Sequence, residues 1–258
     1  MSANSTEKKQ KCMKSLENNI AIFNIDVTKK GQYLYTDAQN VSAQIATARQ
    51  STEIIRLIKD YIGTGKTILD IGAGDGTFTI ELFKTVSPKL IVGFDPASQA
   101  IRAARKKIKS SFKGRIVFKI LNIYDLTRYF KKGEFDVAVV RGVLHHLDDV
   151  QAAITQIGKV VDQVIVLEPN GYNPILKIIE KVSSYHQRHD EKSYWPPHLL
   201  QWFGRQGYSL VEQRFVCIVP YFCPSALARV LKCIEPFFER LPLIRRYYTG
   251  TNVFLVKK

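Results

Sequence analysis

Apolar and polar positions alternate regularly along the middle of this chain. Five short runs rich in β-branched residues have the pattern of buried strands, and they span 67–71, 89–94, 115–121, 135–140 and 163–168. Stretches with helical spacing of apolar residues lie before and between them, at about 44–61, 76–86, 97–111 and 148–160. Strands that alternate with helices form βαβ units, whose parallel sheet is covered by helices on both faces. The pattern therefore predicts an α/β, Rossmann-like, doubly wound and mostly parallel sheet.

The pattern changes after residue 168. Helices are predicted at 174–184 and near 198–206, and strands near 208–219 and 251–257. An insertion at 220–248 separates those last two strands, and we expect Pro236 to divide it into two short helices. We predict an N-terminal extension and cap at 1–43, then one domain at 44–258. Its cofactor half is expected at 66–168 and its substrate-side half at 169–258.

Composition and charge narrow the class of protein. Of the 258 residues, 45% are hydrophobic and 24% are charged, which excludes a mostly disordered chain, a fibrous repeat and a polytopic membrane protein. Lys and Arg number 38 against 23 Asp and Glu, and a net charge of +15 favours anionic partners. The four cysteines form no C-x-x-C pair, and no apolar run is long enough to span a membrane, so we expect a cytoplasmic protein with reduced thiols.

The strongest motif is a glycine-rich turn that directly follows the first buried run. Gly72 and Gly74 allow the backbone to turn sharply and a ligand to lie against it. A dinucleotide-binding turn has the spacing G-x-G-x-x-G, whereas this one is G-x-G-x-G with Asp70 before it and Asp75 inside it. These carboxylates disfavour a diphosphate and suit an ammonium group, and Asp95 ends the next strand, where a ribose diol is bound. A ligand with a ribose and a positively charged amino-acid group points to S-adenosylmethionine.

With these motifs, residues 66–168 resemble the class I S-adenosylmethionine-dependent methyltransferases. The segment 135–147 is similar to the fourth motif of that family and favours its type 11 branch, which includes quinone-biosynthesis enzymes. The resemblance implies cofactor contacts from Tyr35, Asp70, Gly72, Ala73, Gly74, Asp95, Pro96, Asn122, Ile123 and Arg141. Many relatives carry a small polar residue in place of Arg141. This arginine is therefore expected either to contact the cofactor carboxylate or to project into the substrate mouth.

Candidate catalytic groups follow the fourth and fifth strands, at the edge where open α/β sheets bind their ligands. They are His145, His146 and Glu168. For each histidine the alternative is packing within the turn, and for Glu168 it is capping of the following helix. Tyr185, His186 and His189 lie in a polar segment that we expect over the substrate. No metal site is implied, because no third ligand accompanies the two histidines of that segment.

Two segments carry much of the positive charge. Residues 102–115 contain seven basic residues and no acidic one, which fits either a solvated helix or a surface for phosphate groups. The insertion 220–248 combines basic, aromatic and helically spaced apolar residues, which fits a membrane-surface element, a lid or a core helix. We expect a methyltransferase that acts on a small, apolar or lipid-like acceptor, with an anionic membrane surface as a further partner and peripheral location there. The alternatives are an RNA methyltransferase and a non-catalytic scaffold that keeps the fold.

Overall fold

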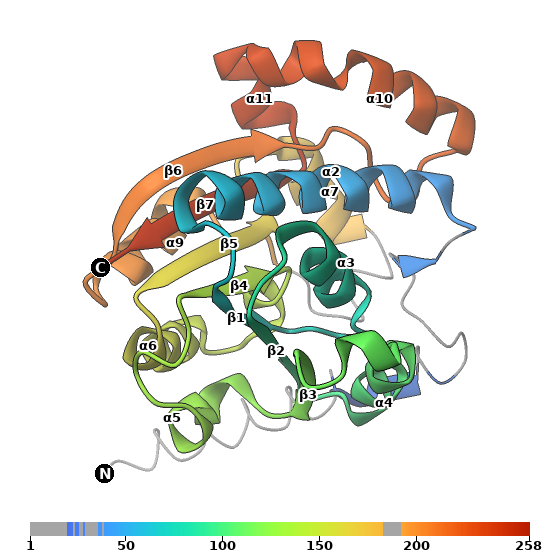
Figure 1. Cartoon of the computed structure of the whole chain (residues 1–258). Helices are drawn as coiled ribbons and strands as arrows, with labels where there is room; N and C mark the ends of the chain where they lie inside the picture. Colours follow the sequence, from blue (N-terminus) through green and yellow to red (C-terminus); the bar gives the residue numbers. More distant parts are fainter. Residues whose placement is uncertain (1–19, 23, 26–27, 29–35, 38, 183–191) are drawn as a thin grey trace.

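A single seven-stranded sheet forms the centre of the protein (Figure 1). The computed structural model describes residues 20–22, 24–25, 28, 36–37, 39–182 and 192–258. The strands are β1 (Thr67–Ile71), β2 (Leu90–Asp95), β3 (Ile116–Ile120), β4 (Val137–Arg141), β5 (Gln163–Pro169), β6 (Ser209–Val216) and β7 (Thr251–Lys257). Their order is β3-β2-β1-β4-β5-β7-β6, and only β7 runs antiparallel to its two neighbours, β5 and β6. The mostly parallel sheet predicted from the sequence is confirmed.

Helices cover both faces of the sheet. They are α2 (Val41–Leu57), α3 (Thr77–Val86), α4 (Ser98–Lys107), α5 (Leu126–Tyr129), α6 (Val150–Val160), α7 (Pro174–Val182), α9 (Pro196–Gly204), α10 (Ser225–Arg240) and α11 (Pro242–Tyr248), with short turns η2 (Ile58–Ile62), η3 (Ser110–Phe112), η4 (Ile123–Asp125) and η5 (Leu144–His146). Adjacent strand residues point to opposite faces: Ile68 belongs to a core that includes residues of α2, α3 and α4, whereas Leu69 belongs to a core that includes residues of α5, α6 and α9. Two apolar cores of this kind establish a doubly wound sheet.

Local capping explains where two helices begin and end. The side chain of Asn40 accepts a hydrogen bond from the Ala43 amide, so α2 begins at Val41, three residues before the predicted start. Helix α4 ends at Lys107, because Ile108 adopts an extended conformation, and the predicted end at residue 111 is wrong. Three basic residues in the last turn of α4 stabilise its carboxyl end.

The insertion between β6 and β7 contains two helices, but the break is not where the sequence predicted it. Helix α10 continues through Pro236 and ends at Arg240. Pro236 lies on an exposed side of α10, where water can satisfy the carbonyl group that loses its helical partner. The break falls instead at Leu241, because the following Pro242 favours an extended conformation in the residue before it. None of the helices that the structure describes is both long and apolar enough to cross a bilayer.

Candidate functional site

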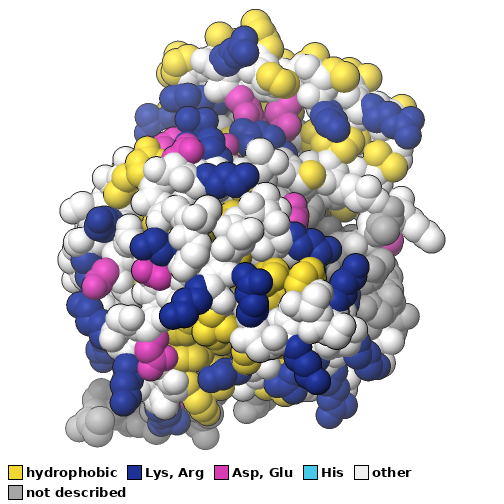
Figure 2. Space-filling model, in the orientation of Figure 1, with side chains coloured by type: hydrophobic (Ala, Val, Ile, Leu, Met, Phe, Trp, Pro, Cys, Tyr) yellow, Lys and Arg dark blue, Asp and Glu magenta, His cyan; other side chains and the backbone are white. Residues whose placement is uncertain are grey.

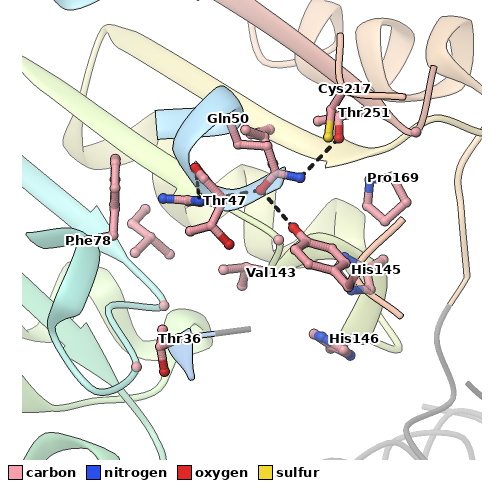
Figure 3. Close-up of a pocket in the computed structure, with 18 of the residues that line it drawn as sticks. Thr36, Thr47, Gln50, Phe78, Val143, His145, His146, Pro169, Cys217 and Thr251 are labelled. Atoms are coloured by element: carbon pink, nitrogen blue, oxygen red, sulfur yellow. Dashed lines mark hydrogen bonds between the residues drawn. The ribbon is translucent and has the colours of Figure 1, made fainter. Parts of the chain in front are cut away.

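A cavity of about 580 Å³ opens at the carboxyl ends of β1, β2 and β4, where an open α/β sheet binds ligands. Its floor is the turn between β1 and α3, and its walls come from α2, α7 and the segment 217–222 (Figure 3). Most of the residues proposed for the cofactor from the sequence line this cavity. They are Asp70, Gly72, Ala73, Gly74, Asp95, Pro96, Asn122, Ile123 and Arg141. Tyr35 lies outside the described residues.

The glycine turn has a backbone that other residues adopt only with strain. Gly72 and Gly74 have φ angles of 78° and 53°, in the left-handed region. The amides of Gly72 and Ala73 both donate to the carbonyl oxygen of Phe94 at 2.9 Å, which ties the turn to the end of β2. A Cβ atom on Gly72 would lie 2.3 Å from Cγ2 of Val143. Glycine at this position therefore lets Val143 of the turn after β4 pack directly against the cavity floor.

Asp70 places a buried carboxylate beside the turn. Its side chain is at the end of β1, only 1% of the residue is exposed, and the Thr79 hydroxyl donates to Oδ2 at 2.5 Å. Burial raises the pKa of Asp70 to about 6, although the Thr79 hydrogen bond and the Arg141 charge oppose this rise. A carboxylate removed from water gains much from a cationic ligand, because the local dielectric constant is low. Asp70 therefore suits an ammonium or sulfonium ligand.

Asp95 is fixed by two backbone amides. Its Oδ1 accepts from Ala97 at 2.8 Å and its Oδ2 accepts from Gly74 at 3.1 Å. Burial raises the pKa of Asp95 to about 6 against the effect of these hydrogen bonds. Each oxygen keeps a further lone pair, so the carboxylate can accept two more hydrogen bonds in the cavity. That geometry suits the adjacent hydroxyl groups of a ribose.

Asn122 and Ile123 form the next part of the wall. The Asn122 side chain accepts from the Tyr124 amide at 3.1 Å, which fixes the start of η4, and Ile123 is a buried apolar contact. Ile123 and Phe94 give this side of the cavity an apolar surface. Such a surface suits a flat aromatic ring.

Asp75 has a different role from the one expected for it. Its Oδ2 accepts from the Lys107 ammonium at 2.8 Å and from the Thr36 hydroxyl at 2.9 Å, and its Oδ1 accepts from the Thr77 amide. Because Lys107 already pairs with this carboxylate, Asp75 is not the partner of a cationic ligand. It connects the N-terminal segment and α4 to the glycine turn, and this corrects the expectation.

Arg141 attaches α2 to the sheet. Its guanidinium donates to the Ser51 hydroxyl and to the Thr47 carbonyl oxygen, both at 3.1 Å, and lies 4.4 Å from the centroid of the Phe78 ring. These bonds to α2 were not anticipated from the sequence. Arg141 also lines the cavity, so it contributes positive charge to the wall that it positions.

Gln50 is a site residue that the sequence analysis missed. Figure 3 shows it in the cavity wall. Its Nε2 donates to the Thr251 hydroxyl at 3.1 Å, and its Oε1 accepts from the Tyr221 hydroxyl at 2.8 Å and from the Arg141 guanidinium at 3.3 Å. It thereby joins α2 to β7 and to the segment 217–222. A signal was present, because Gln50 precedes Ile54 and Leu57 on the otherwise apolar face of α2.

Glu168 lies beneath the cavity rather than in its wall, and it is fully buried. Its Oε1 accepts from the amides of Val143 and Leu144 at 2.9 and 2.8 Å, and its Oε2 accepts from the His145 amide at 3.2 Å. The same Oε2 lies 2.7 Å from Nδ1 of His145. Glu168 therefore holds the η5 turn and the imidazole ring of His145. The sequence analysis had suggested that Glu168 faces the substrate or caps the following helix. In the structure it does neither.

The two histidines line the cavity side by side, with ring centroids 3.9 Å apart. Tyr185, His186 and His189, which were expected over the substrate, lie outside the described residues. Across the part of the chain that the structure describes, no three His, Cys, Asp or Glu side chains come together in a metal-binding arrangement.

Residues 62–207 match the family described as "Methyltransferase domain", and they make up more than half of the chain. The chain belongs to this methyltransferase family. An uncharacterised methyltransferase of Schizosaccharomyces pombe is 30% identical over 118 residues, which are 43% of this chain and 40% of that protein. The demethylmenaquinone methyltransferase of Lactococcus lactis is 31% identical over 109 residues, which are 42% of this chain and 40% of that protein. The matched region thus spans about two-fifths of these curated relatives.

Solved structures support the same fold for this methyltransferase. The magnesium protoporphyrin IX methyltransferase of Synechocystis PCC 6803, solved with bound S-adenosylmethionine, has a TM-score of 0.62 and 13% sequence identity. The match covers 93% of this methyltransferase and 97% of that chain. Together with the family match, this shared fold confirms the resemblance to class I S-adenosylmethionine-dependent methyltransferases.

The other half of the cavity of this methyltransferase is apolar, and its lining residues were not identified from the sequence, which predicted only a substrate-side half within 169–258. Its lining residues come from α7, from the segment 217–222 and from the end of α11. They are Ile175, Leu176, Ile179, Ile218, Val219, Pro220, Phe222 and Tyr248. These residues are brought to the cofactor half only by the tertiary fold, and no local motif marks them.

Proposed function

We propose that this methyltransferase transfers the methyl group of S-adenosylmethionine to an apolar, lipid-like acceptor. The observation that carries the proposal is a continuous cavity in which a half with buried carboxylates meets a half with apolar walls. The first half belongs to residues 66–168 and the second to residues 169–258. We propose this division as the functional organisation of the chain.

The residues of the first half fit the cofactor. Gly72 and Gly74 line the cavity and have no side chain, so a ligand can lie against the backbone of the turn. Asp70 offers a buried negative charge to the methionine ammonium group, and Asp95 offers two acceptor atoms to the ribose diol. When bound, S-adenosylmethionine supplies an electrophilic methyl group on a positively charged sulfur.

The second half supports an apolar acceptor. Its side chains provide few polar groups, so affinity would come from the area of apolar surface removed from water. The Lactococcus relative is named for demethylmenaquinone, which agrees with an acceptor of this kind. The cavity walls hold the acceptor in line with the methyl group, and such positioning contributes on the order of 7–11 kcal/mol to lowering a barrier.

We propose His145 as the general base where the acceptor loses a proton. The Glu168 carboxylate, 2.7 Å from Nδ1, accepts a hydrogen bond from the Nδ1–H group, so the lone pair of the neutral ring is on Nε2. A base of this type contributes about 10²- to 10⁴-fold to a rate. Glu168 is then a positioning residue, and His146, the second histidine of the cavity wall, is a further candidate to contact the acceptor.

We also propose that the protein works in the cytoplasm at a membrane surface, where a lipid-like acceptor is found. Transfer of a labelled methyl group from S-adenosylmethionine into a cell lysate tests the proposed function. The lysate is then separated into lipid, RNA, protein and small-molecule fractions. We expect label in the lipid fraction, and much less of it with His145→Gln at an unchanged melting temperature. Label in RNA alone contradicts the proposed acceptor.

A further inference from the structure

Helix α10 is attached to the rest of the protein by its acidic residues. Glu235 accepts from the Ile218 amide at 2.9 Å, and Glu239 accepts from the Cys217 amide at the same distance. Arg49 of α2 pairs with Glu239 at 2.6 Å. Glu235 is 5% exposed, and burial raises its pKa. The contacts that hold α10 are thus largely polar and reach the cavity wall at 217–222.

The apolar residues of α10 face the other way. Leu227, Val230, Ile234 and Phe237 follow helical spacing and are 48%, 57%, 38% and 64% exposed. Leu243 of α11 continues the surface and is 74% exposed. A surface helix normally buries its apolar stripe, so this arrangement is inverted. A contiguous exposed apolar surface marks an interaction site.

The charge of this surface indicates what covers it. Arg229, Lys232 and Arg240 of α10 and Arg245 of α11 are exposed. Both acidic residues of α10, Glu235 and Glu239, point inward. Figure 2 shows hydrophobic, Lys and Arg side chains together over the end of the molecule that α10 and α11 form in Figure 1. Apolar side chains flanked by cations are the composition of helices that lie in an anionic lipid surface.

The mouth of the cavity borders the same surface. Phe222, just before α10, and Tyr248, at the end of α11, both line the cavity and are exposed. Ile175 of α7 is exposed as well, lines the cavity, and belongs to a helix that contacts α11. The exposed apolar residues at the rim of the acceptor half thus lie on elements that adjoin α10 and α11.

We propose that the outer face of α10 and α11, together with the cavity rim at Phe222, Tyr248 and Ile175, docks this methyltransferase on an anionic bilayer. The docking itself stands on exposure and charge, whereas the delivery of acceptor from the bilayer rests on the proposed function. The polar contacts of Glu235 and Glu239 keep the docked helix connected to the wall of the cavity.

Flotation with vesicles tests the docking face. The full chain is mixed with vesicles of phosphatidylcholine and phosphatidylserine, or of phosphatidylcholine alone, at low and high salt. The test variant is Val230→Ser with Phe237→Ser, because both side chains are exposed; Phe238 is half-buried and is left unchanged. The control is Tyr129→Ser on α5, which removes a side chain of similar exposure at the opposite end of the molecule (Figure 1). Melting temperature and binding of S-adenosylhomocysteine are measured on every preparation.

We expect the wild type and the control to float with the anionic vesicles, and less at high salt because of screening. The double variant should bind the anionic vesicles at least about tenfold more weakly, because two apolar anchors are lost. Replacing Arg229 or Lys232 by Gln should weaken binding about fivefold each at low salt. These results must come with unchanged folding and cofactor binding.

Three outcomes overturn the proposal. The first is a double variant that floats as well as the wild type, and the second is a wild type that does not float at all. The third is a wild type that sediments as a dimer, with Val230→Ser and Phe237→Ser restoring the monomer, because a second copy would then cover this face. Flotation needs no methyl transfer, so a protein that floats but leaves lipid unlabelled supports the docking face and contradicts the proposed acceptor.

Discussion

Replacing Asp70 by Asn should stabilise this methyltransferase and impair its cofactor site. Asp70 is a buried carboxylate at the end of β1, and burial raises its pKa from 3.8 to about 6. The carboxylate is therefore charged at pH 7 at a cost to the folded state. An asparagine is nearly the same size, and its oxygen can still accept the hydrogen bond from the Thr79 hydroxyl.

The direction in which pH changes the free energy of unfolding follows from the number of protons that the folded and unfolded states bind. Between about pH 4 and pH 6, folded Asp70 holds a proton that the unfolded chain has released, so the free energy of unfolding falls as the pH rises through this window. The rise in the pKa of Asp70 from 3.8 to about 6 sets an upper bound of about 3 kcal/mol on the stability that the folded state loses at pH 7 by keeping this carboxylate charged. If the amide recovers roughly 1–2 kcal/mol of it, the melting temperature rises by roughly 2–8 °C.

Thermal unfolding without cofactor at pH 5 and pH 7 provides the assay. Asp70→Asn should melt above the wild type at pH 7, with a smaller difference at pH 5, while its affinity for S-adenosylhomocysteine falls about tenfold or more because a charged partner is lost. Asp136→Asn is the matched control of opposite sign. Burial acts to raise the pKa of Asp136, but hydrogen bonds from Thr67 and the charge of the nearby Lys66 outweigh it and lower this pKa. The Asp136→Asn variant should therefore have a lower melting temperature than the wild type at pH 7. A lower melting temperature for Asp70→Asn at pH 7, or a difference that does not change with pH, would refute the reasoning.

Two further substitutions test the turns around the cavity. Gly72→Ala should lower the free energy of unfolding by roughly 2–5 kcal/mol, from left-handed strain and from the clash with Val143. Gly114 has a similar φ of 81°, but a Cβ atom there would have no neighbour within 4 Å, so Gly114→Ala should cost only about 1–2 kcal/mol. Equal losses of stability for the two variants in denaturant titrations would exclude the clash with Val143. Glu168→Gln places an amide N–H against the donors of η5 and should cost about 2–4 kcal/mol. A melting temperature equal to that of the wild type would show that Glu168 does not hold this turn.

The cofactor half was predictable because its determinants are local. Each buried strand is a short run of β-branched residues, and the carboxyl ends of parallel strands meet at one edge of the sheet. Asp70, Asp95 and Asn122 lie at or just after the carboxyl ends of three such strands, so their proximity follows from the topology alone. Left-handed φ angles at Gly72 and Gly74 likewise agree with the turn expected from the glycine spacing.

The individual contacts of the acceptor half were not predictable, because they join residues that are distant in sequence. The hydrogen bond between Gln50 and Tyr221 joins residues 171 positions apart, and no local pattern specifies it. Pro236 shows a second reason: the sequence indicates a lost hydrogen bond, but only the structure shows that the affected side of α10 faces solvent. The sequence correctly placed Glu168 at the carboxyl end of the fifth strand. The direction of its side chain, toward the amides of η5, depends on tertiary packing.

Calorimetric titration of the protein with S-adenosylhomocysteine tests the central claim, that the cavity above the glycine turn is the cofactor site. We predict saturable binding of S-adenosylhomocysteine and none of NAD. Asp95→Ala should weaken the binding about tenfold or more, because the ribose hydroxyls lose a charged acceptor. Binding by Asp95→Ala as tight as by the wild type, or no binding of S-adenosylhomocysteine to a folded wild type, would contradict the account.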